Sequence, residues 1–161
     1  VLQADPLFAV NTLPDKSPIT IGKDRLQFRV KASRAGYLYV FLAGTDAAHF
    51  YLLFPNKIDK NNRIEADRVS VLPRAGWHIT AGGPPGTNHI VTVVSSHPLD
   101  LSQTGLREDG DIAEFDLKLA AERWAAHTES GSPFLGTPRC EAQPCELSYG
   151  AALVKIDEAA R

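Results

Sequence analysis

The sequence contains no methionine and only two cysteines among its 161 residues. Since position 1 is not methionine, we expect the chain to be a processed product or a segment of a longer protein, and we favour the segment. No apolar run approaches the ~20 residues needed to cross a bilayer, so we expect no membrane insertion by this segment. Net charge is also small, with 17 basic against 19 acidic side chains. This balance argues against a nucleic-acid-binding surface, which requires an excess of basic groups.

The two cysteines, Cys140 and Cys145, lie close together in a loop that contains Pro144. A structural zinc site usually needs four Cys or His ligands at set spacings, and the sequence has no second cysteine pair. The pattern favours a local disulfide, for which the chain-entropy estimate is about 2 kcal/mol. Free thiols or a metal site remain the alternative. A disulfide would indicate an oxidising compartment, which in a bacterium is the periplasm or the cell surface.

Two neighbouring apolar runs, 36–43 and 49–54, are the densest aromatic and branched segments of the chain. Each is short and bounded by turn-forming residues, which is typical of a buried strand. The five residues between the runs have the length of a hairpin connection. We therefore expect the two strands to pair in antiparallel orientation at the centre of a sheet.

Other segments also show the period of a strand. Residues 25–33 alternate between polar and apolar side chains, which predicts a strand with one wet face. Further short strands are expected near 7–11, 19–21, 69–72, 77–81, 89–96 and 146–156. At this length and 43% hydrophobic residues, a single domain over 1–161 is the simplest organisation.

The periodicity changes from Asp111 onward. Asp111 followed by Glu114 has the spacing of a capping box, and apolar residues then recur at helical intervals. This predicts a helix over about 112–127, so that residues 106–161 would supply a helix, the cysteine loop and a closing strand. We expect that strand to pair with the first one. The predicted fold is an antiparallel β-sandwich of immunoglobulin-like architecture with one packed helix.

Seven short pieces occur in one order and spacing over roughly residues 19 to 101. They are Ile21 to Phe28, Gly36 to Tyr39, Leu53 to Asn56, Asn62 to Ile64, Leu72-Pro73, Gly83 to Asn88 and Ser95 to Leu99. This series resembles the bacterial domain-of-unknown-function family 4384. Such domains typically follow Ser/Thr kinase or caspase-like peptidase domains, and some of those kinases are linked to type VI secretion. The resemblance implies an accessory or sensory module and carries over no catalytic residue.

The polar clusters do not form a recognisable reaction centre. Residues 82–86 are rich in glycine, but two prolines remove donors that a phosphate loop would need. The residue types of a Ser-His-Asp triad occur without a Gly-x-Ser-x-Gly elbow, and the acidic cluster at 108–116 lacks the spacing of a calcium loop. We therefore expect no metal and no cofactor. The triad types are Ser95, Ser96, His97, His89, His78 and Asp100.

Aromatic residues beside a sharp turn form the strongest candidate for binding. Tyr51, Phe54, Asn56 and Trp77 could line a shallow pocket for a small ligand, a peptide or a glycan. The aromatic side chains could equally form an apolar plug at one end of the sandwich. Asn56 is expected to bond the backbone of its own turn.

These observations favour a non-enzymatic, periplasmic or otherwise extracytoplasmic domain that recognises a protein, peptide or small ligand for a larger envelope protein. A transmembrane Ser/Thr kinase linked to type VI secretion is the parent that the resemblance suggests. One alternative is a small hydrolase that uses Ser96 and His97. Another is a structural module that holds a complex together, with a homodimer as one arrangement.

Overall fold

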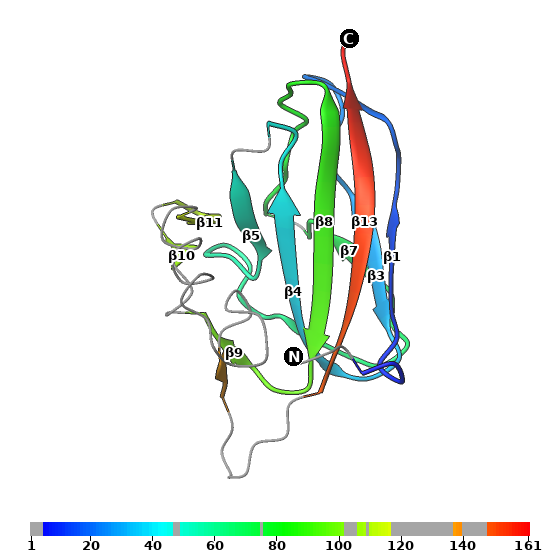
Figure 1. Cartoon of the computed structure of the whole chain (residues 1–161), viewed down its shortest axis with the longest axis vertical. Helices are drawn as coiled ribbons and strands as arrows, with labels where there is room; N and C mark the ends of the chain where they lie inside the picture. The colour runs from blue at the N-terminus through cyan, green and yellow to red at the C-terminus, as the bar shows by residue number, and fades with distance from the viewer. Residues whose placement is uncertain are drawn as a thin grey trace.

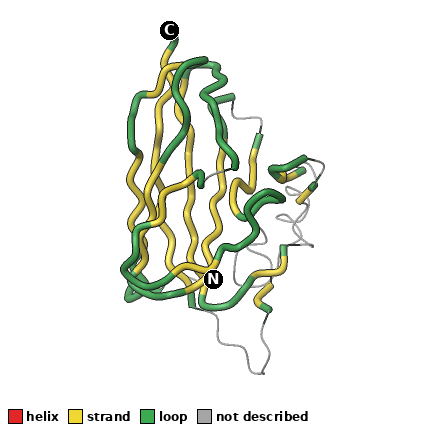
Figure 2. Tube along the Cα trace, turned by 180° about the vertical axis from the view of Figure 1, so that it is seen from behind, coloured by secondary structure: helices red, strands yellow, loops and turns green. Residues whose placement is uncertain are grey.

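The computed structural model describes residues 5–46, 49–74, 76–101, 106–108, 110–116, 137–139 and 148–161. These residues form a large and a small sheet packed face to face, and a separate pair of short strands, seen from opposite sides in Figures 1 and 2. The predicted mostly-β sandwich is confirmed. The described ranges contain no helix long and apolar enough to cross a membrane.

The small sheet has the order β1-β3-β7, and its strands are antiparallel. Its members are β1 (Val10–Pro14), β3 (Phe28–Ala32) and β7 (Ser70–Leu72). In β3 the side chains alternate as predicted, with Phe28, Val30 and Ala32 buried and the two between them exposed. One face of this sheet therefore packs on the core while the other faces solvent.

The large sheet has the order β10-β11-β5-β4-β8-β13-β2. The predicted hairpin is confirmed, because β4 and β5 pair in antiparallel orientation near the middle of this sheet. Two further short strands, β9 and β12, pair with each other beside it (Figure 1). The bounds are β2 (Ile19–Thr20), β4 (Gly36–Ala43), β5 (Phe50–Phe54), β6 (Arg63–Ile64), β8 (Gly86–Ser95), β9 (Leu99–Asp100), β10 (Leu106–Arg107), β11 (Ala113–Phe115), β12 (Thr137–Pro138) and β13 (Tyr149–Ala159). The short strand β6 pairs with the beginning of β4.

Apolar side chains pack on both faces of the large sheet. Because successive residues of a strand point to opposite faces, Leu38 and Val40 of β4 enter the cluster between the sheets. Tyr39 and Phe41 enter a second cluster on the outer face, together with Phe115 and residues of β5, β8 and β9. Burial on both faces explains why β4 is a nearly continuous apolar run instead of an alternating one.

The prediction of a helix beginning at Ile112 is wrong. Ala113–Phe115 form strand β11, which pairs with β5 and with β10. Burial there has a period of two, with Ala113 and Phe115 inside. The ring of Phe115 stacks on Phe50 at a centroid distance of 4.9 Å, so cross-strand aromatic packing outweighs the capping signal. The rest of the predicted helix, and the predicted Cys140–Cys145 disulfide, lie outside the described residues.

Two smaller expectations also differ from the structure. The closing strand β13 pairs with β8 along its length and with β2 at its end, and not in a ladder with the first strand. Between 77 and 81, where a strand was expected, the described chain forms only an isolated bridge between Arg25 and Thr80.

Candidate ligand-binding groove

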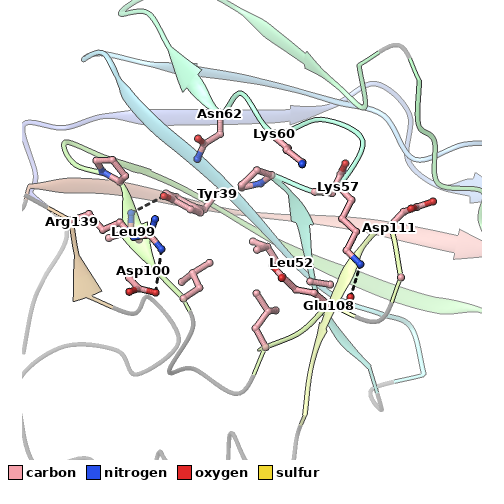
Figure 3. A pocket seen from close by; sticks show the side chains of 17 residues that line it. Tyr39, Leu52, Lys57, Lys60, Asn62, Leu99, Asp100, Glu108, Asp111 and Arg139 are labelled. Carbon is pink, nitrogen blue, oxygen red and sulfur yellow. Dashed lines mark hydrogen bonds and ion pairs between the residues drawn. The ribbon is translucent and has the colours of Figure 1, made fainter.

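A groove of about 890 Å³ lies on the outer face of the large sheet (Figure 3). One side is formed by β4 and the loop that follows β5, and the other by residues of 98–101, 106–113 and 139. Its volume falls within the range of small-ligand sites, which is roughly 300–1,000 Å³. Its lining combines an apolar set, Tyr39, Leu52, Pro55, Pro98, Leu99, Leu101, Leu106 and Ala113, with a polar set, Asn56, Lys57, Lys60, Asn62, Asp100, Glu108, Asp111 and Arg139, and Gly110.

Tyr39 fixes the first wall of the groove. Its side chain is 4% exposed, and its hydroxyl accepts a hydrogen bond of 2.7 Å from the backbone N–H of Leu99. This contact holds β9 against β4. Next to this contact, on the facing wall, Arg139 and Asp100 form an ion pair at 3.5 Å (Figure 3).

Lys57 ties the loop that follows β5 to the facing wall. Its ammonium group donates to the backbone carbonyl of Glu108 at 2.6 Å, and its backbone N–H donates to the carbonyl of Asp111 at 3.1 Å. Lys60 is exposed at the same rim (Figure 3) and has no hydrogen bond or ion pair within the described part of the chain. The Lys60 ammonium is therefore available to an incoming group.

Asn56 shapes the turn that presents these lysines. Its Oδ1 accepts from the backbone N–H groups of Ile58 and Asp59 at 3.0 and 2.8 Å, and its Nδ2 donates to the carbonyl of Leu53 at 2.9 Å. The expectation that Asn56 bonds its own turn is confirmed. At the end of the loop, Asn62 exchanges bonds with the backbone of Leu38, so both ends of the loop are tied to the sheet.

An ion pair beneath the loop holds its middle. Arg74 donates two hydrogen bonds to the carboxylate of Asp59, the one from Nε at 2.7 Å, and the Trp77 indole N–H donates to the same group at 3.2 Å. The guanidinium of Arg74 also lies over the ring of Phe54, 4.9 Å from its centroid. The hydrogen bonds from Arg74 lower the pKa of Asp59. The loop therefore rests on a charged anchor and an aromatic stack.

The structure separates the four residues predicted to bind a ligand. Phe54 and Trp77 are 1% and 7% exposed and stack at 6.3 Å between the sheets, which is the plug arrangement. Tyr51 is half-buried, packs against the inner cluster and stacks on His49 at 5.9 Å. Burial, with nearby Glu114 and Asp46, raises the pKa of Tyr51. Only Asn56 lines the groove.

The residue types of a hydrolase triad do not form one among the described atoms. The Ser95 hydroxyl donates to the carbonyl of His97, and the Ser96 hydroxyl accepts from the N–H of Ser148 at 3.0 Å. His78 and His89 are exposed. Over the described ranges, no serine hydroxyl bonds a histidine ring, and no group of three metal-ligating side chains converges.

One wall of this groove lies within a region that matches a known family. Residues 20–98 match the family described as domain of unknown function DUF4384. The resemblance inferred from the seven sequence pieces is thereby confirmed. No curated protein and no solved structure matches the chain at the level of significance required. The DUF4384 region supplies Tyr39 and the loop with Lys57 and Lys60, whereas the facing wall, from Leu99 onward, follows it in sequence.

The shared pieces of the DUF4384 pattern contact one another in the fold. A Cβ atom at Gly36 would lie 2.5 Å from the backbone oxygen of Ser95, so two of the pieces meet at a point that admits only glycine. Asn62 bonds Leu38, and Tyr39 bonds Leu99. These residues therefore build the sandwich and one wall of the groove, and their roles are structural.

Acidification tests the anchor beneath the loop. The folded-state pKa of Asp59 is lowered, so its stabilisation is present above the unfolded-state value of about 3.9 and is lost as pH falls through the lowered value. Replacing Asp59 with asparagine should cost about 1–3 kcal/mol at pH 6, since Arg74 loses its charged partner. The difference between wild type and Asp59→Asn should shrink at pH 3 in urea unfolding. Exposed Glu65→Gln is the control, and a difference independent of pH would contradict the assignment.

Proposed function

We propose that this chain is a non-catalytic recognition domain that binds a peptide segment of a partner protein in the groove beside Tyr39. The single observation that carries this proposal is the groove itself, an apolar floor bordered by charged groups. Apolar surface with a few placed polar groups is the usual composition of a binding pocket. Among the described residues, no serine hydroxyl bonds a histidine ring, so the described part of the chain offers no paired nucleophile and base that would favour hydrolysis over binding.

The chemistry of the rim indicates what kind of peptide would fit. The apolar residues Leu52, Leu101 and Leu106 of the lining can bury an aliphatic or aromatic side chain. The Lys60 ammonium can pair with a carboxylate of the same ligand. A peptide with an apolar side chain and a nearby Asp, Glu or C-terminal carboxylate satisfies both groups.

The family resemblance supports a broader setting for this function. The resemblance to this family implies that such domains accompany Ser/Thr kinase or caspase-like domains. We therefore propose that the chain is the sensory part of a bacterial envelope protein. A periplasmic location follows if the Cys140–Cys145 disulfide forms. In that setting, peptide binding would shift the population of states of the parent protein.

A charge reversal at the groove tests the proposal. Random 12-residue peptides displayed on phage would be selected against the 161-residue chain, resynthesised and measured by fluorescence anisotropy. Lys60→Glu should weaken the selected peptides about ten-fold or more, equal to about 1.4 kcal/mol, because it replaces attraction of the carboxylate with repulsion. Lys23→Glu makes the same charge change at an exposed site outside the groove and should change the affinity less than two-fold.

Circular dichroism would establish that both variants keep the strand signal of the wild type. Selected peptides that bind Lys60→Glu as tightly as wild type would contradict the proposal. The same conclusion would follow if no peptide were enriched over an unrelated β-sandwich used as the selection control.

A further inference from the structure

The outer face of the small sheet combines basic and aliphatic side chains. The strand register places Leu13, Arg29 and Val71 in one row across β1, β3 and β7. The next row pairs Asn11 with Lys31, and continuation of the β3–β7 register places Val69 beside Lys31. Figure 1 draws β3 and β7 behind the large sheet, and Figure 2 views the molecule from their side.

This face is open to solvent. The exposed fractions of the side chains of Leu13, Val69 and Val71 are 67%, 58% and 38%. Arg25 precedes β3 and continues its alternation of exposed and buried residues, and Arg25, Arg29 and Lys31 are all exposed. Arg29 forms an ion pair with Asp15 at 3.1 Å. In the described part of the chain, Arg25 and Lys31 make no ion pair, so their charges are not neutralised by the protein.

The charge of this face is opposite to that of the whole chain. The exposed basic residues Arg25, Arg29 and Lys31 lie there, with Asp15 paired to Arg29, while the chain carries a net charge of −2. The face therefore complements an anionic surface. Aliphatic side chains standing between the basic groups add a contact that a purely electrostatic site would not have.

The composition favours a lipid surface over a protein surface. The cores of protein interfaces are enriched in aromatic residues and methionine and depleted of lysine. The outward side chains of β1, β3 and β7 include lysine and aliphatic residues but no aromatic ring. Basic groups at the headgroup level with aliphatic groups below them are the pattern of a membrane-surface contact.

We propose that the outer face of the small sheet, defined by Leu13, Arg25, Arg29, Lys31 and Val71, docks on an anionic lipid bilayer. This surface is on the layer opposite the peptide groove, so the two proposals are independent. Docking through the small sheet leaves the groove facing away from the membrane, where a partner protein can reach it.

Vesicle flotation tests the lipid proposal. The chain would be mixed with vesicles of 70% phosphatidylcholine and 30% phosphatidylglycerol, and with pure phosphatidylcholine vesicles, at low and at physiological salt. It should float with the anionic vesicles only, and more strongly at low salt. The double variant Arg25→Glu with Lys31→Glu should lower the partition coefficient at least about 25-fold, since each basic group near such a surface contributes about five-fold.

Two single variants test whether the effect on flotation is specific to the outer face of the small sheet. Leu13→Ser should lower the partition coefficient about ten-fold, because it removes an inserted alkyl group. Lys155→Glu changes an exposed charge on β13 of the large sheet and should leave flotation within two-fold of wild type. A loss in Lys155→Glu as large as the loss per replaced basic residue in the double variant would show a general effect of net charge and overturn the proposal.

Failure of the wild type to float with anionic vesicles would also overturn it. A photo-crosslinker placed at Leu13 would detect the competing outcome, in which this face binds a protein. Capture of an acidic protein without vesicle binding would assign this face to a protein and reject the lipid surface. None of these results would alter the peptide affinities expected for Lys60→Glu, so failure here is distinguishable from failure of the groove proposal.

Discussion

Replacing Phe54 with alanine should lower the free energy of unfolding by about 3–5 kcal/mol, the usual cost of emptying a buried aromatic site. The side chain is 1% exposed, stacks on Trp77 at 6.3 Å and lies beneath the guanidinium of Arg74. Its removal leaves a cavity and takes away the support under Arg74 and Asp59. Urea unfolding followed by tryptophan fluorescence would measure the change.

A surface aliphatic residue provides the matched control. Leu153 is 59% exposed on β13, so Leu153→Ala should change stability by less than about 0.5 kcal/mol. A loss below about 1 kcal/mol for Phe54→Ala, comparable to ordinary surface variants, would mean that the Phe54–Trp77 stack is not the plug of the sandwich. The alternative interpretation, in which Phe54 and Trp77 bind a ligand, would then be favoured.

Replacing Gly150 with alanine should destabilise the protein by about 3 kcal/mol or more, the upper end of the range for overpacking. A Cβ atom at this position would overlap the backbone oxygen of Phe8 and would lie 2.9 Å from Cγ2 of Val10. Because the first obstacle is backbone, a change of rotamer cannot relieve it. The segment that leads into β1 would have to move away from β13.

Gly44→Ala is the corresponding control. Its nearest neighbour would be the Asp46 side chain at 3.6 Å, an ordinary contact. Stability should therefore stay within about 1 kcal/mol of wild type, since alanine also restricts the unfolded chain. If Gly150→Ala were as stable as Gly44→Ala in urea unfolding, the close crossing of residues 8 and 150 would not exist in solution.

The sheets follow from local patterns that the sequence displays directly. The alternation in residues 25–33 and the two apolar runs at 36–43 and 49–54 predicted strands that the structure contains. These signals depend on period-two burial and on turn residues, both of which are local. The helix prediction at residues 111–116 was wrong because a capping pattern is also local, whereas the place of β11 in the sheet depends on its pairing with β5 and β10.

The groove could not be predicted in the same way. Tyr39, Lys60, Leu99 and Arg139 are far apart in the sequence and meet only when β9 folds against β4. The aromatic residues chosen from sequence, Phe54 and Trp77, carried the correct signal of large apolar area, but Phe54 at the end of β5 and Trp77 in the loop after β7 both pack into the cluster between the sheets. The side chain of Tyr39 on β4 points to the outer face of the large sheet instead. Its hydroxyl accepts a hydrogen bond from the backbone of Leu99, as a buried tyrosine hydroxyl requires a partner.

Groove and small-sheet face lie on different layers, which suggests how the domain could act. The groove belongs to the outer face of the large sheet, and the basic face belongs to the small sheet. Membrane docking on one layer and peptide capture on the other would place a sensory domain between an envelope membrane and its partner. Each surface can be removed by charge reversal without touching the core between them.

The most direct test of the recognition proposal is an amide chemical-shift map of the ¹⁵N-labelled chain titrated with a peptide selected from the phage library. The account predicts that the largest shifts cluster at the groove, in particular at Lys57, Lys60, Leu99 and Ala113, and that Lys60→Glu abolishes them at the same peptide concentration. Shifts confined to β1, β3 and β7, with these four amides unmoved, would contradict it.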